Sequence, residues 1–131
     1  MKYTALILIG LLYIQVSKCQ QLQKEKEYLF QKWWHNNEND KDDMQTFRPE
    51  GYNLPPSRGR TGIEFKKDGT FINYDIAPAD GSLIESGQWE TKNKNLTEIF
   101  IRYKKNKIEK TGIIKIKYLS KDKLQCVIQL E

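Results

Sequence analysis

Apolar and polar residues alternate along most of this chain from Leu29 onward, and this period of two restricts its fold more than any other feature. The alternation is clearest in four segments: Ile63–Phe65, Ile72–Ile76, Ile99–Tyr103 and Ile114–Tyr118. Successive side chains of a β-strand point to opposite faces, so the pattern predicts strands with one buried face. No comparably long segment has an apolar stripe at helical spacing, and we therefore predict an all-β protein.

Turn-forming residues separate the alternating segments. Asp68-Gly69 lies between two of them, and this pair is the strongest short signal for a β-hairpin. Because nearly every connection is short enough for a hairpin, sequential strands are expected to pair antiparallel. About eight such strands close most simply into a small up-and-down barrel, which has no free edges. We predict one barrel domain over residues 29–131.

The connection from Glu38 to Arg60 is longer than the others. Its first residues are acidic, and Gln45–Arg48 is long enough for a short strand. Three prolines then restrict the backbone to an extended path that leads into the next strand.

Residues 1–19 have the pattern of an export signal. Lys2 precedes Tyr3–Val16, an uncharged apolar run that suits a secretory signal and is short for the ~20 residues of a membrane span. Cleavage after Cys19 would leave small side chains where signal cleavage requires them. In the rival interpretation Val16–Cys19 is a lipobox, so that Cys19 is lipidated and anchors the protein to a membrane. Both predict export: a secreted, periplasmic or membrane-anchored protein.

Residues 20–28 are polar, and they predict a tail or a short helix ahead of the barrel. Cys126 lies in an alternating apolar segment near the C-terminus, so we expect it to fill space in the core. A disulfide between Cys19 and Cys126 requires that Cys19 stays in the mature chain unmodified.

The formal charge of +5 is spread unevenly over the 131 residues. Residues 20–91 carry nine basic and 13 acidic side chains, whereas residues 92–123 carry 11 basic and three acidic ones. A basic region can attract anionic partners. Lysines on outer strand faces also serve solubility and oppose edge pairing, which is the commoner role. Motifs for binding nucleic acid are absent, and we do not expect that partner.

Four aromatic residues fall on strand faces that the alternation assigns to the interior: Tyr74, Trp89, Tyr103 and Tyr118. They either pack as ordinary core or line a pocket for a flat or apolar ligand. Gly87 precedes Trp89 and lets another segment approach closely, so Trp89 is expected to be mostly buried.

Arg48, Arg58 and Arg60 lie in the long, proline-rich connection. Guanidinium groups can bind a carboxylate or phosphate through two parallel hydrogen bonds, which would suit the polar end of an anionic amphiphile. They can equally pair with internal carboxylates or stack on tryptophan rings. We expect the internal, structural role.

His35 is the single histidine, and with Glu38 and Asp80 it could form an acid–base group. One histidine with scattered carboxylates is a weak signal for catalysis or zinc. A histidine at the barrel rim, hydrogen-bonded to a carboxylate, is the simpler interpretation. We therefore predict no catalytic residues, no bound metal and no cofactor.

Several short motifs, taken in order, resemble those of small, uncharacterised bacterial lipocalin-like proteins. They are Trp34–Glu38, Phe47-Arg48-Pro49, Leu54–Arg60, Asp68-Gly69, Pro78-Ala79-Asp80 and Gly87-Gln88-Trp89, and they cover roughly residues 29–90. The resemblance implies a calycin-type barrel and no established activity. The Gly-x-Trp that opens true lipocalins is missing from the first strand. The expected mature chain, residues 20–131, is also short, so we expect a shallow barrel.

We therefore expect a non-catalytic binding module for a small apolar or amphiphilic ligand, with His35 and the arginines near the mouth of the barrel. The alternative is a structural or protein-interaction domain whose core is filled by its own aromatic residues. A hydrolase or lyase that uses His35 with a carboxylate is the third, weaker alternative.

Overall fold

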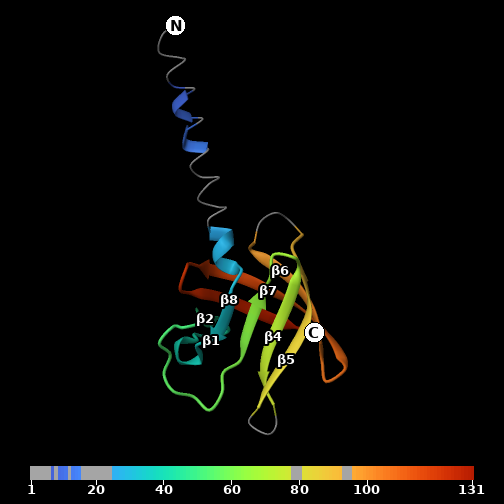
Figure 1. The fold of residues 1–131 in the computed structure, drawn as a ribbon. Coiled ribbons are helices and arrows are strands. Elements are labelled where there is room, and N and C mark those ends of the chain that lie inside the picture. The colour runs from blue at the N-terminus through green and yellow to red at the C-terminus, as the bar shows by residue number, and fades with distance from the viewer. Residues whose placement is uncertain (1–6, 8, 12, 16–24, 78–80, 93–95) are drawn as a thin grey trace.

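The computed structural model describes residues 7, 9–11, 13–15, 25–77, 81–92 and 96–131. In these residues eight antiparallel strands form a closed barrel, which confirms the predicted all-β architecture (Figure 1). The strands are β1 (Lys32–His35), β2 (Gln45–Pro49), β3 (Gly62–Phe65), β4 (Thr70–Ile76), β5 (Ser82–Glu90), β6 (Glu98–Lys105), β7 (Ile108–Leu119) and β8 (Leu124–Leu130). A 3-10 turn, η1 (Asn37–Asn39), lies between β1 and β2.

One connection departs from a plain up-and-down order. The order around the barrel is β1-β2-β8-β7-β6-β5-β4-β3, so β1 pairs with both β2 and β3. Both run antiparallel to β1, and residues 50–61 must therefore return along the outside of β1; we call residues 50–61 the strap. The Glu50 N–H donates to the Lys32 carbonyl at one end of β1, and the His35 N–H donates to the Thr61 carbonyl at the other. With 12 residues, the strap has the length that a crossover between parallel strands needs, about a dozen.

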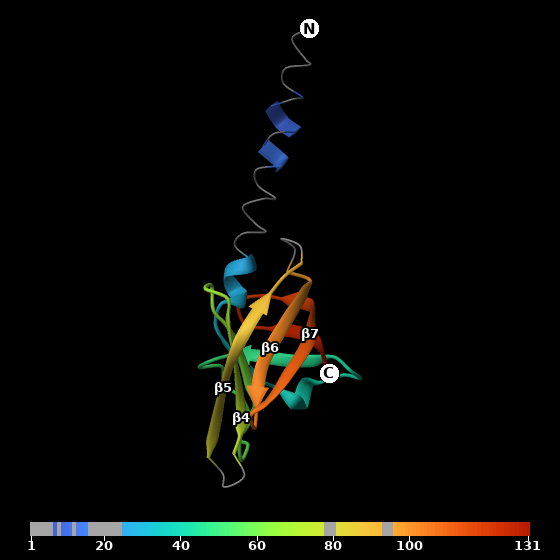
Figure 2. The same cartoon turned by 90° about the vertical axis from the view of Figure 1, so that its right-hand side faces the viewer.

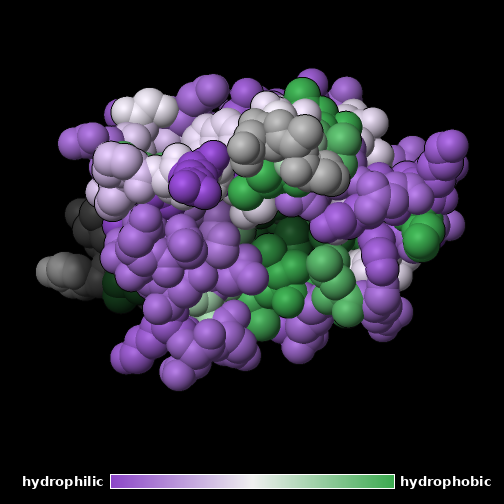
Figure 3. Space-filling view, turned by 90° about the horizontal axis from the view of Figure 1, so that it is seen from below, coloured by the Kyte–Doolittle hydropathy of each residue, from purple (hydrophilic) through white to green (hydrophobic). Residues whose placement is uncertain are grey.

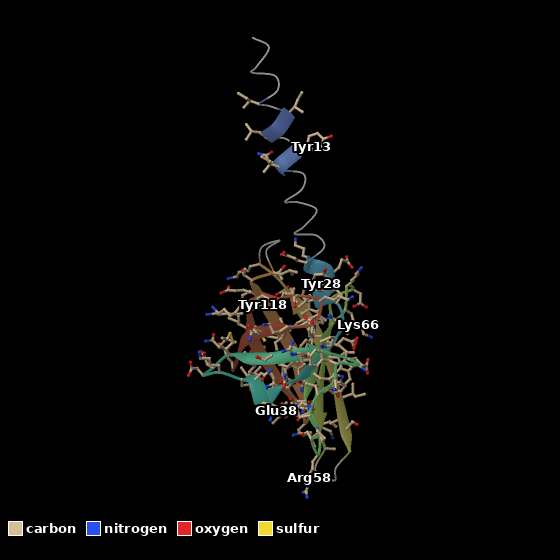
Figure 4. The ribbon with its side chains drawn as sticks, turned by 90° about the vertical axis from the view of Figure 1, so that its left-hand side faces the viewer. Tyr13, Tyr28, Glu38, Arg58, Lys66 and Tyr118 are labelled. Carbon is tan, nitrogen blue, oxygen red and sulfur yellow. The ribbon has the colours of Figure 1, made fainter. Side chains whose placement is uncertain are left out.

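The end of the barrel that carries Tyr28 and Lys66 in Figure 4, here the upper end, is closed by residues 25–29, which are helical. Leu29 is fully buried there, and its carbonyl accepts a hydrogen bond of 3.1 Å from the indole N–H of Trp33. Trp89 packs against Phe30 and Phe65, with ring centroids 6.0 Å apart in both pairs. The upper end is therefore filled by aromatic and aliphatic side chains.

The expected processing site, including Cys19, lies outside the described residues. Residues 7, 9–11 and 13–15 are helical. None of the helices in the described part of the chain has the length and hydrophobicity to cross a membrane.

The inward-facing side chains of the strands, together with Leu29, form one core. Its fully buried members include Leu29, Trp33, Ile99, Ile114, Leu124 and Cys126. The expected space-filling role of Cys126 is confirmed: it is a free thiol, and burial raises its pKa to about 12.

Gly87 faces the interior where β5 meets β6. A Cβ atom at this position would lie against the Arg102 carbonyl and only 2.7 Å from the Tyr103 Cα, so a side chain here would force β6 away. The predicted close approach is confirmed. Trp89 is mostly buried, as predicted, and it packs against the core near the upper rim.

The predicted inward face of Tyr118 is wrong, because a β-bulge reverses the alternation. The register between β7 and β8 shifts between Ile116 and Tyr118, so that Leu119 instead of Tyr118 follows Ile116 on the inner face. Tyr118 is 47% exposed.

The inward face predicted for Tyr74 is also wrong. On β4 the interior face carries Phe71, which is buried, and Asn73, whereas Ile72 and Tyr74 face outward. Tyr74 packs on the outer side of the barrel against Trp34, with ring centroids 5.4 Å apart. The alternation predicted the wrong face because β4 has large apolar residues on both faces. The outward-facing Tyr74 is covered by the neighbouring Trp34.

Candidate ligand-binding site

The barrel is hollow at its lower end, the end that carries Arg58 in Figure 4. A cavity of about 220 Å³ lies there, and six of the eight strands, all but β1 and β5, supply its walls. Its apolar lining includes Phe47, Ile63, Phe71, Ile101, Ile114 and Ile128. Seen from below, the molecule has a hollow with hydrophobic residues in it, surrounded by hydrophilic ones (Figure 3).

Polar side chains from several strands surround this cavity. Gln45, Thr61, Asn73, Asp75, Tyr103 and Lys105 all contribute to its lining. The Lys105 Nζ lies 2.6 Å from an Asp75 carboxylate oxygen. This hydrogen bond lowers the pKa of Asp75 and raises that of Lys105, so both groups stay charged over a wide pH range. An apolar interior with an ion pair at its rim suits a molecule with one apolar and one polar end.

Glu85 is a carboxylate on the inner face of β5, beside this rim, and is only 7% exposed. Its Oε1 accepts a hydrogen bond of 3.2 Å from the Asn73 amide, whereas Oε2 has no partner among the described residues. A buried polar atom without a partner is destabilising by about 1–3 kcal/mol, and more when it is charged. An acceptor that the described residues do not satisfy therefore lies beside the rim, next to Asn73.

Tyr103 is the one aromatic candidate that both faces the interior and lines this cavity. Burial raises the pKa of its hydroxyl, which keeps it protonated and able to donate a hydrogen bond. Trp89 faces inward at the upper end, where its indole N–H donates to the Lys66 carbonyl at 2.8 Å, and it does not line the cavity.

Arg60 is held by contacts inside the protein. Its guanidinium makes two hydrogen bonds to the Glu38 carboxylate, of 2.7 and 3.0 Å, and others to the carbonyls of His35 and Pro55. The bond from Arg60 lowers the pKa of Glu38. Arg60 thus ties η1 to the strap, as the structural interpretation expects.

Arg48 lies apart from the other two arginines. Its guanidinium lies over the Tyr52 ring, 4.6 Å from the centroid, and donates to the Asp122 carbonyl at 3.2 Å. The three arginines therefore do not converge on one site.

Arg58 is exposed and lines a groove of about 540 Å³ on the outside of the barrel, between the strap and the β4–β5 hairpin. Trp34, Tyr74 and Lys32 lie in the same groove, with the Lys32 Nζ 4.9 Å from the Tyr74 ring centroid. The Tyr74 hydroxyl donates to Glu64 at 2.7 Å; burial first, and this bond second, raise the pKa of Tyr74. Three of the predicted ligand residues, Arg58, Arg60 and Tyr74, thus line a groove outside the barrel.

His35 is hydrogen-bonded to a carboxylate, but the partner is Asp40. The His35 Nε2 lies 2.8 Å from an Asp40 oxygen, and the other Asp40 oxygen accepts from the Thr46 N–H. The ring stacks on Phe47, with centroids 5.1 Å apart.

Of the other two predicted partners of His35, Glu38 is bound by Arg60, and Asp80 lies outside the described residues. No group of three or more potential metal ligands occurs in the part of the chain that the structure describes.

The sequence did not identify five polar residues that line the cavity, nor Glu85 beside them: Gln45, Thr61, Asn73, Asp75 and Lys105. A usable signal was present for two of them, since Asn73 and Asp75 follow Phe71 at intervals of two and so share its inward face. Choosing Phe71 over Ile72 as the inward residue would have placed both at the cavity.

Comparison with known proteins gives no match, whether with family models, curated proteins or solved structures. The geometry of the cavity is thus the basis for any functional assignment.

Proposed function

We propose that this barrel is a binding module that holds a small apolar or amphiphilic molecule in its lower cavity. One observation carries the proposal: an apolar hollow inside the barrel ends in a rim of polar side chains, and the Glu85 carboxylate next to Asn73 of this rim has a buried oxygen without a partner among the described residues. Such a combination of apolar walls and a few placed polar groups is typical of small-molecule sites.

The volume restricts the size of the ligand. A cavity of about 220 Å³ is smaller than the roughly 300–1,000 Å³ of drug-sized pockets. An apolar cavity of roughly 150 Å³ can hold benzene. The proposed ligand is therefore a little larger than a single aromatic ring, and a long-chain lipid would not fit inside.

The charges at the rim favour one class of polar end. Asp75 and Glu85 supply two carboxylates against the single ammonium of Lys105, which Asp75 already engages. A neutral donor or a cationic group would complement this arrangement better than an anion. The arginines, which suggested an anionic amphiphile, lie outside the cavity lining.

An NMR titration with four probes tests the proposal: 4-methylphenol, phenethylamine, phenylacetate and palmitate. We expect the first two to shift the backbone resonances of Ile101 and Tyr103, with saturation, and the last two to shift them little. If none of the four perturbs a residue of the cavity, the protein is the alternative, a structural or interaction domain whose interior serves only packing.

A matched pair of variants locates the binding. Ile128→Phe places extra volume in the cavity and should weaken binding, because Ile128 is part of its lining. Ile72→Phe makes the same change on the outer face of β4 and should leave binding unchanged. Equal affinities for both variants would mean that the probe binds elsewhere, with the outer groove at Arg58 and Tyr74 as the next place to examine.

The same proposal includes export, because residues 1–19 have the pattern of a signal and the motifs resemble those of lipocalin-like secreted proteins. Sequencing of the N-terminus of protein from its own host tests this part. The expected product begins at Gln20 or at a lipidated, membrane-anchored Cys19, and a cytoplasmic product that begins at Met1 would contradict it.

A further inference from the structure

One strand of the barrel has an edge that the barrel leaves unpaired. β5 pairs with β4 along the whole of Ser82–Gln88, but it pairs with β6 only from Gly87 to Glu90. Residues 82–86 therefore have no strand partner on the β6 side among the described residues. Figure 2 shows the lower half of β5 diverging from β6. The barrel is thus closed near its upper end and open between these two strands near its lower end.

The hydrogen-bonding direction of this edge follows from two contacts in the β4–β5 ladder. The Trp89 N–H donates to the Gly69 carbonyl, and the Ala77 N–H donates to the Gly81 carbonyl. Because the direction alternates along an antiparallel strand, the odd-numbered residues of β5 face β4. The N–H and C=O groups of Ser82 and Ile84 then point away from β4, toward the open side.

This edge has few of the features that normally prevent edge-to-edge pairing. Exposed edges are commonly protected by lysine, proline or a bulge. Residues 82–86 have neither lysine nor proline, and Ile84 is 64% exposed. Their single charge is Glu85, which is already buried within its own barrel, so that pairing would not bury a new charge.

We propose that this edge pairs antiparallel with the same edge of a second copy of the chain. The segment Ser-Leu-Ile-Glu-Ser is nearly symmetric about Ile84. A two-fold axis at Ile84 places Ile84 opposite Ile84 of the second copy, each serine opposite a serine, and Leu83 opposite Glu85. No like charges face each other, and isologous two-fold contacts are the commonest way in which identical chains associate.

The pairing gains backbone hydrogen bonds at Ile84 and covers its exposed side chain. A contact of five residues on each chain is small compared with the roughly 1,200–2,000 Å² of stable complexes. The proposed dimer is therefore weak and forms in a concentration-dependent manner.

Sedimentation velocity of the purified protein over a range of concentrations up to about 1 mM, a typical Kd for weak association, tests this inference. The parent chain should shift from monomer to dimer. Ile84→Lys and Ile84→Pro should stay monomeric, and proline is tolerated because the Ile84 N–H does not bond to β4. Ile108→Lys is the matched control, since Ile108 is an isoleucine of similar exposure, 62%, on β7, and it should still dimerise.

Disulfide trapping tests the register independently of those variants. Residues opposite each other in a hydrogen-bonded antiparallel pair have Cα atoms ~5.5 Å apart, within the range that a disulfide spans. Ile84→Cys should therefore form a covalent dimer under mild oxidation, at least tenfold faster than Ile108→Cys or the parent chain.

Three results would overturn the proposal. A parent chain that is monomeric at all concentrations excludes the dimer. A dimer that persists in both Ile84 variants, without trapping at Ile84→Cys, uses a different surface. An edge that binds an added extended peptide while the chain itself remains monomeric serves another partner. All three leave the cavity binding described above unaffected, because that binding is measured on the monomer.

Discussion

The two ends of this barrel differ in how completely they are closed. At the upper end the helical residues 25–29 and a set of fully buried side chains, among them Leu29 and Trp33, pack the interior. At the lower end the interior holds a cavity, polar groups surround it, and β5 separates from β6. The barrel thus combines a packed end with an open one.

The difference shows how a small barrel can be stable and still keep a hollow. Burial of large apolar side chains is the main stabilising contribution to folding, and the upper end concentrates it. The lower end is free to keep an unsatisfied carboxylate oxygen on Glu85 and an ion pair between Asp75 and Lys105. The unsatisfied oxygen, which is costly for stability, thus lies beside the proposed ligand site.

The largest effect is expected at the closed end. Trp33→Ala should lower the free energy of unfolding by about 3–5 kcal/mol, the usual range for deletion of a buried tryptophan, as measured by urea denaturation. Trp34→Ala on the outer face of the same strand is the control and should cost less than half as much. Equal losses would mean that the upper core does not dominate stability.

A second substitution tests the boundary where β5 joins β6. Gly87→Ala should destabilise by about 1–3 kcal/mol, because the added Cβ collides with the backbone of β6. Gly81→Ala meets no atom closer than 3.7 Å and serves as the control. A Gly87→Ala variant as stable as the parent would show that the two strands can separate here without cost.

At the lower end, Arg60→Lys should lower the melting temperature by a few degrees, the change that follows from a loss of about 1 kcal/mol in a domain of this size. Lysine keeps the charge but cannot make the paired hydrogen bonds to Glu38. Arg58→Lys should melt like the parent, because Arg58 is exposed. The reverse ranking in differential scanning calorimetry would move the structural role to Arg58.

The smallest effect concerns the ion pair at the cavity. The pKa of Asp75 is lowered in the folded state, so its contribution is present in full above the ordinary aspartate pKa of about 3.9. It is lost as the pH falls through the lower, folded-state value. Asp75→Asn should therefore be less stable than the parent at pH 7 by under about 1 kcal/mol, since the pair is partly exposed, and the difference should shrink by pH 2.5.

The control for that experiment is Lys105→Gln, which removes the partner and should reduce the same pH dependence. Urea midpoints measured from pH 2.5 to 7 give the comparison. A parent–variant difference that stays constant over this range would mean that the Asp75–Lys105 pair contributes nothing to acid stability.

The alternation from Leu29 onward was sufficient to predict an all-β chain, about eight strands and antiparallel pairing, because a period of two is a local property of each strand. Hairpins were predictable for the same reason. The buried Cys126 and Tyr103 followed from their positions in alternating segments, and the space-limited role of Gly87 followed from its lack of a side chain.

Other features depended on contacts between residues far apart in the sequence. The strap crosses β1 because β1 lies between β2 and β3 and pairs with both. No local sequence pattern specifies that strand order. The β-bulge turned Tyr118 outward, and the covering tryptophan allowed Tyr74 to face outward. The pairing of Arg60 with Glu38 and of His35 with Asp40 likewise required knowledge of which loops meet.

The sequence by itself determined the fold class and the strands, since side-chain periodicity and turn chemistry act over a few residues. Only the tertiary structure decided where the hollow lies, which polar groups surround it and which strand edge stays unpaired. These depend on the register and closure of the whole barrel, because a cavity is the space left when eight strands have been positioned against one another.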